Sequence, residues 1–277
     1  MRNLTSLLLL LAWAGAASGQ VPLAPEQAQA LMSRALASEV RASQDANHPM
    51  HYRLRRSSPR ITSTKEIVES RDGDVARLVA INDQPLSQAD EQREQARLDM
   101  LLSDPGRQRH RKQSEESDTR IVLKLLRMLP QAFTYEYAGT DGKTVKYRFR
   151  PNPGFTPPDY ETQALTAMSG EIWIDAAEER VMRLEGHLQQ DTDYGWGILG
   201  KLDKGGWIVI EQASVGQGQW RIARFQMKMN LRVLFKTRSF DTVEEMIGYA
   251  PAPAGIDYRQ AIQMLRGGTG SAGQPSR

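Results

Sequence analysis

Residues 220–237, WRIARFQMKMNLRVLFKT, contain a long alternation of apolar and polar side chains. Every odd position from 225 to 235 is apolar, whereas Trp220 and Ile222 occupy even positions. An alternation of period two predicts a β-strand with one buried face. The change of phase near Ala223 predicts a β-bulge, which keeps all the apolar side chains on one face. Because no turn residue interrupts the alternation after the bulge, we predict one unusually long, curved strand here.

Alternation of the same kind recurs on the N-terminal side of this stretch, broken by hairpin turns. Asp72-Gly73 separates two such runs, and Asp141-Gly142 separates an aromatic run at 133–137 from its return at 145–149. About nine candidate strands joined in this way indicate one mostly antiparallel sheet. They lie at 51–55, 61–71, 75–81, 133–137, 145–149, 171–175, 182–188, 207–212 and 220–237.

Two substantial helices are predicted between these strands. Residues 24–42 have apolar side chains at helical spacing, and a second helix begins at Ser87, with Asp90 three residues later, and ends at Asp104. A short apolar helix follows at 121–128. Helices can cover the concave face of a curved antiparallel sheet. We therefore predict an α+β fold: a strongly curved, mostly antiparallel sheet, or incomplete β-barrel, with helices packed on its concave face.

The N-terminus and the composition predict an exported protein. Residues 1–19 have the positive start, the apolar run and the small-residue cleavage site, ending at Gly19, of a secretory signal peptide. The chain has no cysteine, so disulfides and thiolate chemistry are excluded. Its net charge is only +3, which does not favour nucleic-acid binding. The basic run at 107–112 is followed at once by acidic residues, so 107–118 is expected to be a solvated charged loop or a frayed helical extension.

These features divide the chain into three parts. Residues 1–19 are the signal peptide, and 20–248 form the half-barrel domain. Residues 249–277 consist of a linker, a short helix at 257–265 and a disordered Gly/Ser tail. The mature protein is expected to be periplasmic or secreted, monomeric and without a transmembrane segment.

Gly195, Gly197 and Gly200 have the G-x-G-x-x-G spacing of a dinucleotide-binding loop. That motif needs a helix opening at its third glycine, and Gly205-Gly206 would disrupt such a helix. We therefore predict no cofactor at this site, but a bent strand followed by a hairpin turn at 204–206.

No catalytic or metal-binding residues are assigned from the sequence. His48 and His51 lack the H-E-x-x-H pattern of helical zinc sites, with only Asp45 as a nearby carboxylate. No serine has the G-x-S-x-G context of a nucleophile elbow. Asp191 and Asp193 are explained by a polar junction between a strand and a turn.

The order of strands and helices resembles that of the periplasmic lipoprotein carriers LolA and LolB over residues 25–240. The segments SSPRITSTKEIVESRDG, LPQAFTYEY, FRPNPGF and DYGWGILGKLDKGGW also resemble a group of exported bacterial proteins, a resemblance that implies no particular chemistry. The carriers are incomplete β-barrels with a helical lid, and the cavity between sheet and lid takes lipoprotein acyl chains. The resemblance thus implies a noncatalytic cell-envelope protein that binds or carries a lipid or a lipoprotein acyl chain.

Carried over to this chain, the resemblance implies a cavity lined by apolar faces of two strands. The expected lining residues are Met182, Leu184, Leu188, Phe225, Met227, Met229, Leu231, Val233 and Phe235. Methionines offer adaptable walls for a flexible chain, although a stripe of this kind is also typical of an ordinary core. The alternatives are an envelope scaffold that binds another envelope protein, without a ligand, and, with less support, a hydrolase.

Overall fold

The computed structural model describes residues 23–45, 47–194, 200–233 and 236–267. Thirteen strands in this part form one open antiparallel sheet, ordered β4-β3-β2-β1-β13-β12-β11-β8-β7-β6-β5, with β10 beside β12 and β9 beside β10. The strands are β1 (Met50–Ser57), β2 (Thr62–Val68), β3 (Val75–Ile81), β4 (Gln84–Pro85), β5 (Phe133–Asp141), β6 (Thr144–Pro151), β7 (Met168–Asp175), β8 (Arg180–Leu188), β9 (Thr192–Tyr194), β10 (Gly200–Leu202), β11 (Trp207–Ser214), β12 (Trp220–Val233) and β13 (Lys236–Pro251).

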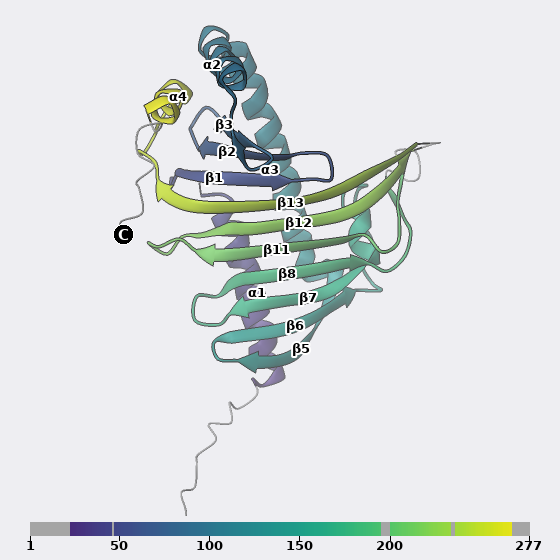
Figure 1. Ribbon diagram of the computed structural model, residues 1–277. Helices are drawn as coiled ribbons and strands as arrows, with labels where there is room; N and C mark the ends of the chain where they lie inside the picture. Colours follow the sequence, from purple (N-terminus) through teal and green to yellow (C-terminus); the bar gives the residue numbers. More distant parts are fainter. Residues whose placement is uncertain (1–22, 46, 195–199, 234–235, 268–277) are drawn as a thin grey trace, which may run out of the picture.

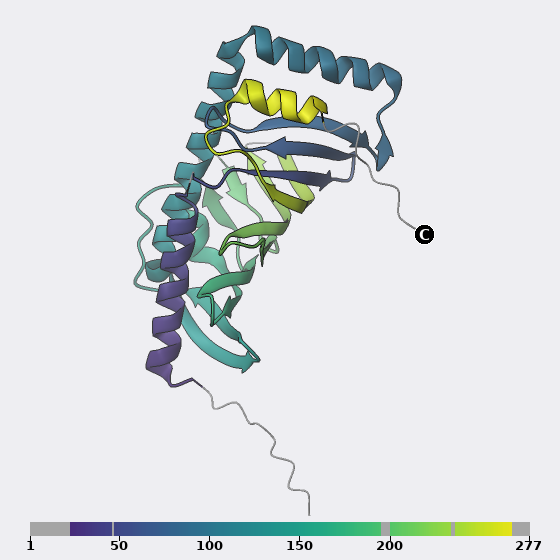
Figure 2. The ribbon, with the colours of Figure 1, turned by 90° about the vertical axis from the view of Figure 1, so that its left-hand side faces the viewer.

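Four α-helices occur in the same described part of the chain: α1 (Pro25–Ala42), α2 (Gln88–Ser103), α3 (Pro105–Ala132) and α4 (Tyr258–Gly267). A short 3₁₀-helix, Gln163–Ala167, precedes β7. Figures 1 and 2 show α1 and α3 side by side along the concave face of the sheet, which we call the inner face. The predicted α+β class, the antiparallel sheet and the covering of its concave face by helices are confirmed.

The predicted bulge in β12 is present. Glu211 of β11 pairs with Arg224, but the next residue, Gln212, pairs with Ile222, so that Ala223 is the extra residue. The bulge restores the phase of the strand.

The predicted length of this strand is wrong. β12 ends at Val233, and β13 begins at Lys236 and pairs with it in an antiparallel hairpin, Val233 opposite Lys236. The reversal therefore occurs without the glycine, proline, asparagine or aspartate that usually marks a turn. β13 itself, 16 residues long, was missed because its polar side chains hide the alternation.

Helix α1 covers the inner face of β6, β7 and β8. Val145, Tyr147, Ile172 and Ile174 are all at most 1% exposed beneath it, and each contributes on the order of 1.5–3 kcal/mol by burial. The Tyr147 hydroxyl donates a hydrogen bond of 2.7 Å to the carbonyl of Ala28 in α1. Helix and sheet are thus joined by apolar packing together with a buried polar contact.

A buried carboxylate fixes the C-terminal half of α1 to the sheet. Glu39 accepts hydrogen bonds from Arg180 Nε at 2.9 Å and from the backbone N of Val181 at 2.9 Å, both in β8. Its second oxygen accepts from Gln212 of β11 at 2.9 Å and from Arg180 Nη2 at 3.2 Å. The Arg180 guanidinium also lies 5.8 Å from the ring of buried Trp220. Because every oxygen has donors, the charge is tolerated in the interior.

Two glycines pair across β7 and β8. Gly170 lies opposite Gly186 in the register. A Cβ at Gly170 would lie 1.8 Å from the carbonyl oxygen of Glu185, so no other residue fits. A Cβ at Gly186 would meet Met168 and Ile208 at 2.7 and 3.3 Å, so these side chains fill the space that the glycine leaves. Gly170 thus permits a close approach of β7 and β8 that a side chain would prevent.

Helices α2 and α4 complete the other end of the sheet. Glu94 of α2 accepts a hydrogen bond from the backbone N of Leu78 at 2.8 Å, and Arg97 of α2 donates to the carbonyl of Ala76. These side chains satisfy the open edge of β3. The predicted cap of α2 is confirmed, because Ser87 accepts from the backbone N of Asp90.

Helix α4 confirms the predicted short helix but belongs to the folded core. Ala261, Ile262 and Leu265 are at most 1% exposed among residues of β2, β3 and α2. The boundary expected between 248 and 249 falls within β13. The tail from residue 268 onward and residues 1–19, expected to be a signal peptide, lie outside the described residues.

Of the two structures expected for 107–118, the charged loop is wrong and the helical one is confirmed, because these residues form the first half of α3. Asp104 caps the backbone N of Gly106 at 3.0 Å, and opposite charges one turn apart, Arg111 and Glu115, form an ion pair of 2.9 Å. Gln108 is buried and donates hydrogen bonds to the carbonyls at 72 and 73 in the turn between β2 and β3. Tertiary contacts thus stabilise a helix that local composition does not reveal.

The glycine motif contains no helix start in its described part. Gly200 begins β10 with φ +149°, and a Cβ there would lie 2.4 Å from the carbonyl oxygen of Arg232. Gly205 occupies the turn before β11 with φ +83°. The predicted strand and hairpin turn are confirmed for 200–207, and Gly200 permits close approach of β10 to β12. Gly195 and Gly197 lie outside the described residues.

Removal of the Glu39 carboxylate should destabilise the protein strongly. In Glu39→Ala, Arg180 remains buried without its partner, which costs about 3–5 kcal/mol. Arg34→Ala is the matched control on the same helix, because its ion pair with Glu179 is exposed and contributes less than about 1 kcal/mol. Urea unfolding measures both. If both variants lost the same small amount of unfolding free energy, the buried pair of Glu39 and Arg180 would not be what holds α1.

Candidate functional site

The candidate site is an apolar stripe on the inner face of β11, β12 and β13. Residues directly opposite in an antiparallel register share a face, and the pairs Ile208–Met227 and Met229–Phe240 place three strands on one surface. All of its members are only half-buried. We call these residues the open stripe: Ile208, Ile210, Phe225, Met227, Met229, Leu231, Val233 and Phe240.

The open stripe continues the face that α1 covers, but its burial is different. Leu184 of β8 lies opposite Ile210 on one side and opposite Ile172 on the other, so the register runs unbroken from the covered part to the stripe. Ile172 is 1% exposed, whereas Ile210 is half-buried. Apolar area therefore remains accessible on one part of a face that is sealed elsewhere.

Five of the nine residues expected to line a cavity belong to the open stripe. Of the remaining four, Leu184 is half-buried and packs against the core, and Leu188 is only 2% exposed. Met182 lies at a bulge, where it has no paired residue in β7. Its Sδ lies 3.6 Å from Thr144 Oγ1. Phe235 lies outside the described residues. The five that share the stripe are Phe225, Met227, Met229, Leu231 and Val233.

Charged residues border the stripe at both ends. Glu244 lies opposite Phe225 and forms an ion pair of 2.9 Å with Arg56. At the other end, Arg238 lies opposite Leu231, and Lys236 lies opposite Val233. Sequence reasoning missed these two cations, because on one continuous strand the even-numbered residues would point away from the apolar face. The chain reversal after Val233 places them on that face.

The outer face of the sheet is dominated by ion pairs. Trp173 of β7 lies between Lys146 at 4.9 Å and Arg183 at 5.6 Å from its ring, and Arg183 also pairs with Glu185 and Glu211. Such cross-strand pairs keep an exposed sheet surface soluble.

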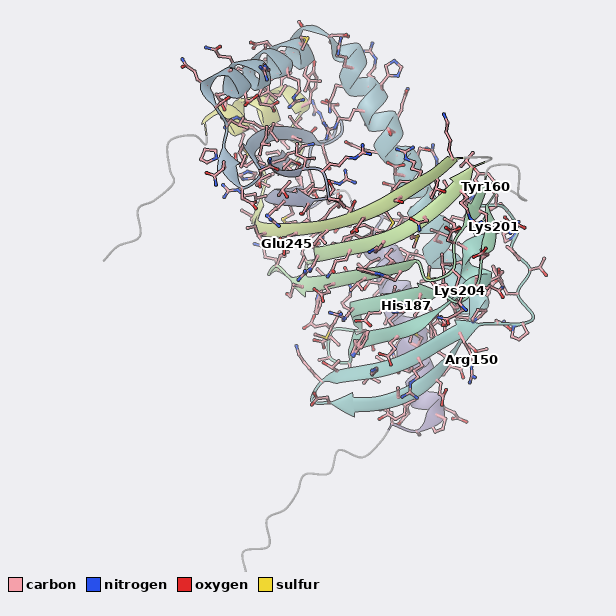
Figure 3. The ribbon with its side chains drawn as sticks, turned by 45° about the vertical axis from the view of Figure 1, so that its right-hand side comes forward. Arg150, Tyr160, His187, Lys201, Lys204 and Glu245 are labelled. Atoms are coloured by element: carbon pink, nitrogen blue, oxygen red, sulfur yellow. The ribbon has the colours of Figure 1, made fainter. Side chains whose placement is uncertain are left out.

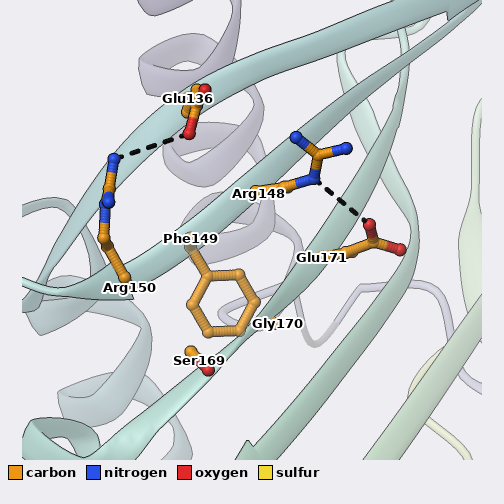
Figure 4. Close-up of a pocket in the computed structure, with 7 residues that line it drawn as sticks. All are labelled: Glu136, Arg148, Phe149, Arg150, Ser169, Gly170 and Glu171. Atoms are coloured by element: carbon orange, nitrogen blue, oxygen red, sulfur yellow. Dashed lines mark hydrogen bonds and ion pairs between the residues drawn. The ribbon is translucent and has the colours of Figure 1, made fainter.

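A shallow pocket of about 270 Å³ lies on this outer face (Figure 4). It is lined by Gly170 and Phe149 together with charged residues of β5, β6 and β7. Its charged residues pair with one another, Arg150 with Glu136 at 3.5 Å and Arg148 with Glu171 at 3.8 Å. The pocket therefore offers little unpaired charge to a ligand.

A second pocket, of about 520 Å³, lies between the C-terminal turn of α3 and the loop that follows β6. Its lining combines Met128 and Phe155 with the polar side chains of Gln131 and Asn152. Asn152 donates a hydrogen bond of 2.9 Å to the carbonyl of Gln131, which ties the loop to the helix.

The histidines do not form a metal centre. His48 Nδ1 lies 2.6 Å from Asp45 Oδ2 in an exposed pair, and His51 lies in β1. Within the described ranges, no three His, Cys, Asp or Glu side chains are arranged to hold a metal ion. His187 is exposed on the outer face of β8.

Partly buried acidic groups gather where α3 meets the turn between β2 and β3. Burial, together with the neighbouring carboxylates of Glu115 and Glu69, raises the pKa of Asp74 to about 7. Burial also raises the pKa of Glu69 and of the stacked tyrosines Tyr52 and Tyr249, whose ring centroids are 4.7 Å apart. Glu115 accepts a hydrogen bond of 2.9 Å from the backbone N of Asp74. These contacts hold α3 against the sheet.

Comparisons with known proteins add little to this geometry. The sequence matches no protein-family model and no curated protein. It is similar to a solved domain from Vibrio parahaemolyticus provisionally named an outer membrane lipoprotein-sorting protein, with 10% identity, a TM-score of 0.30, and coverage of 84% of this chain and 97% of that chain. A likeness of this degree supports no conclusion about this chain.

Along the residues described, no helix combines the length and apolar character needed to cross a bilayer.

A charge should be tolerated on the open stripe but not in the sealed part of the same face. We expect Met229→Asp to fold, at a cost of about 1–2 kcal/mol, because its half-buried position leaves the carboxylate partly hydrated. Ile174→Asp, at a site with 0% exposure, should prevent folding. Circular dichroism and urea unfolding measure the difference. Loss of folding in both variants would mean that the stripe is ordinary core.

The contribution of Asp74 to the free energy of unfolding should fall as pH rises through the acidic range. The pKa of Asp74 is raised from the ordinary 3.8, so the folded state binds this proton more tightly than the unfolded chain. The resulting stabilisation is full below pH 3.8 and is lost by about pH 7. Asp74→Asn should remove this loss, so its stability relative to wild type should be about 4 kcal/mol higher at pH 8 than at pH 4. The same difference in the free energy of unfolding between wild type and Asp74→Asn at pH 4 and at pH 8 would contradict the assignment.

Proposed function

We propose that this protein is a noncatalytic carrier of the cell envelope that holds a lipid or a lipoprotein acyl chain on the open stripe. The observation that supports the proposal is the burial gradient along one continuous sheet face, sealed beneath α1 and half-buried on β11–β13. Contiguous accessible apolar surface on a soluble protein is typical of an interaction site.

The chemistry of the stripe suits a flexible apolar ligand. Met227 and Met229 lie at its centre, with Phe225 and Phe240 beside them. Thioether side chains adapt to ligands of variable shape, and aromatic rings add large apolar area. The stripe itself contains no group that could act as nucleophile, acid or base, so its chemistry favours binding over catalysis.

Placement in the cell envelope follows from the signal-type sequence at 1–19 and is part of the proposal. The described residues contain no membrane-spanning helix, and the polar outer face of the sheet suits a protein surrounded by water. In this role, the monomer would shield an acyl chain from water between two membranes or along one of them.

Binding of a fluorescent fatty acyl probe tests the proposal. Met229→Asp should weaken probe binding at least about tenfold, because the carboxylate must lose water when the chain covers it. Asn230→Asp is the matched control: it adds the same charge to the same strand on the opposite face, and should bind as wild type does.

Two outcomes would contradict the proposal. One is absence of probe binding by folded wild-type protein. The other is undiminished binding by folded Met229→Asp, which would place the ligand elsewhere. A protein partner that co-purifies in place of lipid would favour an envelope scaffold.

A further inference from the structure

The β12–β13 hairpin extends beyond the strands on both of its sides. β11 pairs with β12 only as far as Trp207 opposite Lys228, and β1 pairs with β13 only as far as Ser57 opposite Val243. Register pairs from Met229–Phe240 to Val233–Lys236 lie past these limits, and within the described ranges only β10 flanks them. At about 3.4 Å per residue, these five pairs project by roughly 15 Å. Figure 1 shows this end of the two strands reaching beyond the sheet.

One face of the projecting hairpin combines apolar and cationic side chains. Leu231 lies opposite Arg238 and Val233 opposite Lys236, so two cations stand directly beside the outer end of the open stripe. The Arg238 guanidinium lies 5.3 Å from the ring of Phe240, itself a member of the stripe.

The cations on the opposite face of this end are paired with acids. Arg232 binds Asp191 at 2.7 Å and also contacts Asp203. Lys201 lies 3.7 Å from Asp193, and Lys228 lies 3.8 Å from Asp241. Figure 3 shows Lys201 and Lys204 toward the projecting end of β12 and β13, whereas Glu245 lies toward the other end of β13.

By contrast, Lys236 and Arg238 have no acidic partner among the residues that the structure describes. Glu244, the acid that shares their face of β13, lies at the inner end of the stripe and is paired with Arg56. Along the described part of β12 and β13, the two cations at the outer end of the stripe are therefore left without an acidic partner.

We propose that the ligand of the open stripe is an amphiphile with an anionic headgroup, a carboxylate or a phosphate. Its head contacts Arg238 and Lys236, while its apolar chain lies inward along Leu231, Met229 and Met227. Charge complementarity favours this orientation, because guanidinium and ammonium groups donate strong hydrogen bonds to such anions. The inference rests on the proposed function and adds to it the charge and direction of the ligand.

The test compares two fluorescent probes with the same alkyl chain, one a fatty acid and the other the corresponding alcohol. Wild-type protein should bind the acid about tenfold more tightly than the alcohol. The double variant Lys236→Gln/Arg238→Gln should bind the two probes equally, with its affinity for the alcohol unchanged. The matched control Lys201→Gln/Lys228→Gln removes the same charge from the opposite face and should keep the preference.

Each other outcome has a defined meaning. Equal wild-type affinity for acid and alcohol, or a preference that survives in Lys236→Gln/Arg238→Gln, overturns this inference and leaves the proposed function standing. Failure of wild type to bind either probe overturns both. If the double variant does not fold, the wild-type preference decides: it should nearly vanish at 1 M salt, where the screening length is about 3 Å, and persistence there contradicts the inference.

Vesicles containing phosphatidylglycerol distinguish two roles for these cations: binding the headgroup of a carried ligand, or contacting a membrane surface. If Lys236→Gln/Arg238→Gln loses vesicle binding but keeps the preference for the free acid, the two cations contact a bilayer and the inference is wrong. Acid and phosphate headgroups are then compared by replacing the fatty acid with a lysophospholipid of the same chain length, and either headgroup supports the inference.

Discussion

The buried carboxylate of Glu39 fixes where α1 lies on the sheet. Its four hydrogen bonds join the helix to Arg180 and Val181 of β8 and to Gln212 of β11. An 18-residue helix spans about 27 Å and cannot cover a sheet of thirteen strands. With α1 held over β6–β8, the inner face of β11–β13 keeps accessible apolar area. The site therefore arises from incomplete coverage of a curved sheet.

The chain reversal between β12 and β13 determines the chemistry of that site. Two residues separate Val233 from Lys236, so the apolar positions of β12 lie directly opposite Lys236 and Arg238. A hairpin with one residue more or fewer would place these cations on the outer face, because successive strand residues alternate in direction. This register alone therefore places positive charge at one end of the apolar surface.

Periodicity predicted those parts of the fold in which one face is buried. The strands of the N-terminal meander, the aromatic hairpin and the bulge at Ala223 were all predicted from alternation, and the amphipathic pattern predicted α1. Stabilisation from elsewhere in the chain accounts for the failures. The first half of α3 depends on contacts such as Gln108 with the β2–β3 turn, and β13 carries polar side chains that pair with β1 and β12. The turn after Val233 lacks any usual turn residue.

The candidate site was predictable only in part for the same reason. The alternation of β12 gave Phe225, Met227 and Met229, because these lie on one strand. Ile208, Phe240 and Arg238 come from neighbouring strands, and their place beside β12 depends on pairing registers that no local pattern specifies. Conversely, Leu188 has the right period but is covered, since periodicity reports a buried face without showing what covers it.

Methyl NMR of the methionines tests the location of the site most directly. Met227 and Met229 lie on the open stripe, Met32 is buried in α1, and Met128 lines the second pocket. Titration with a fatty acyl ligand should shift the methyl signals of Met227 and Met229 and leave those of Met32 and Met128 in place. Shifts confined to Met128, or saturable binding without any change at Met227 and Met229, would contradict the account.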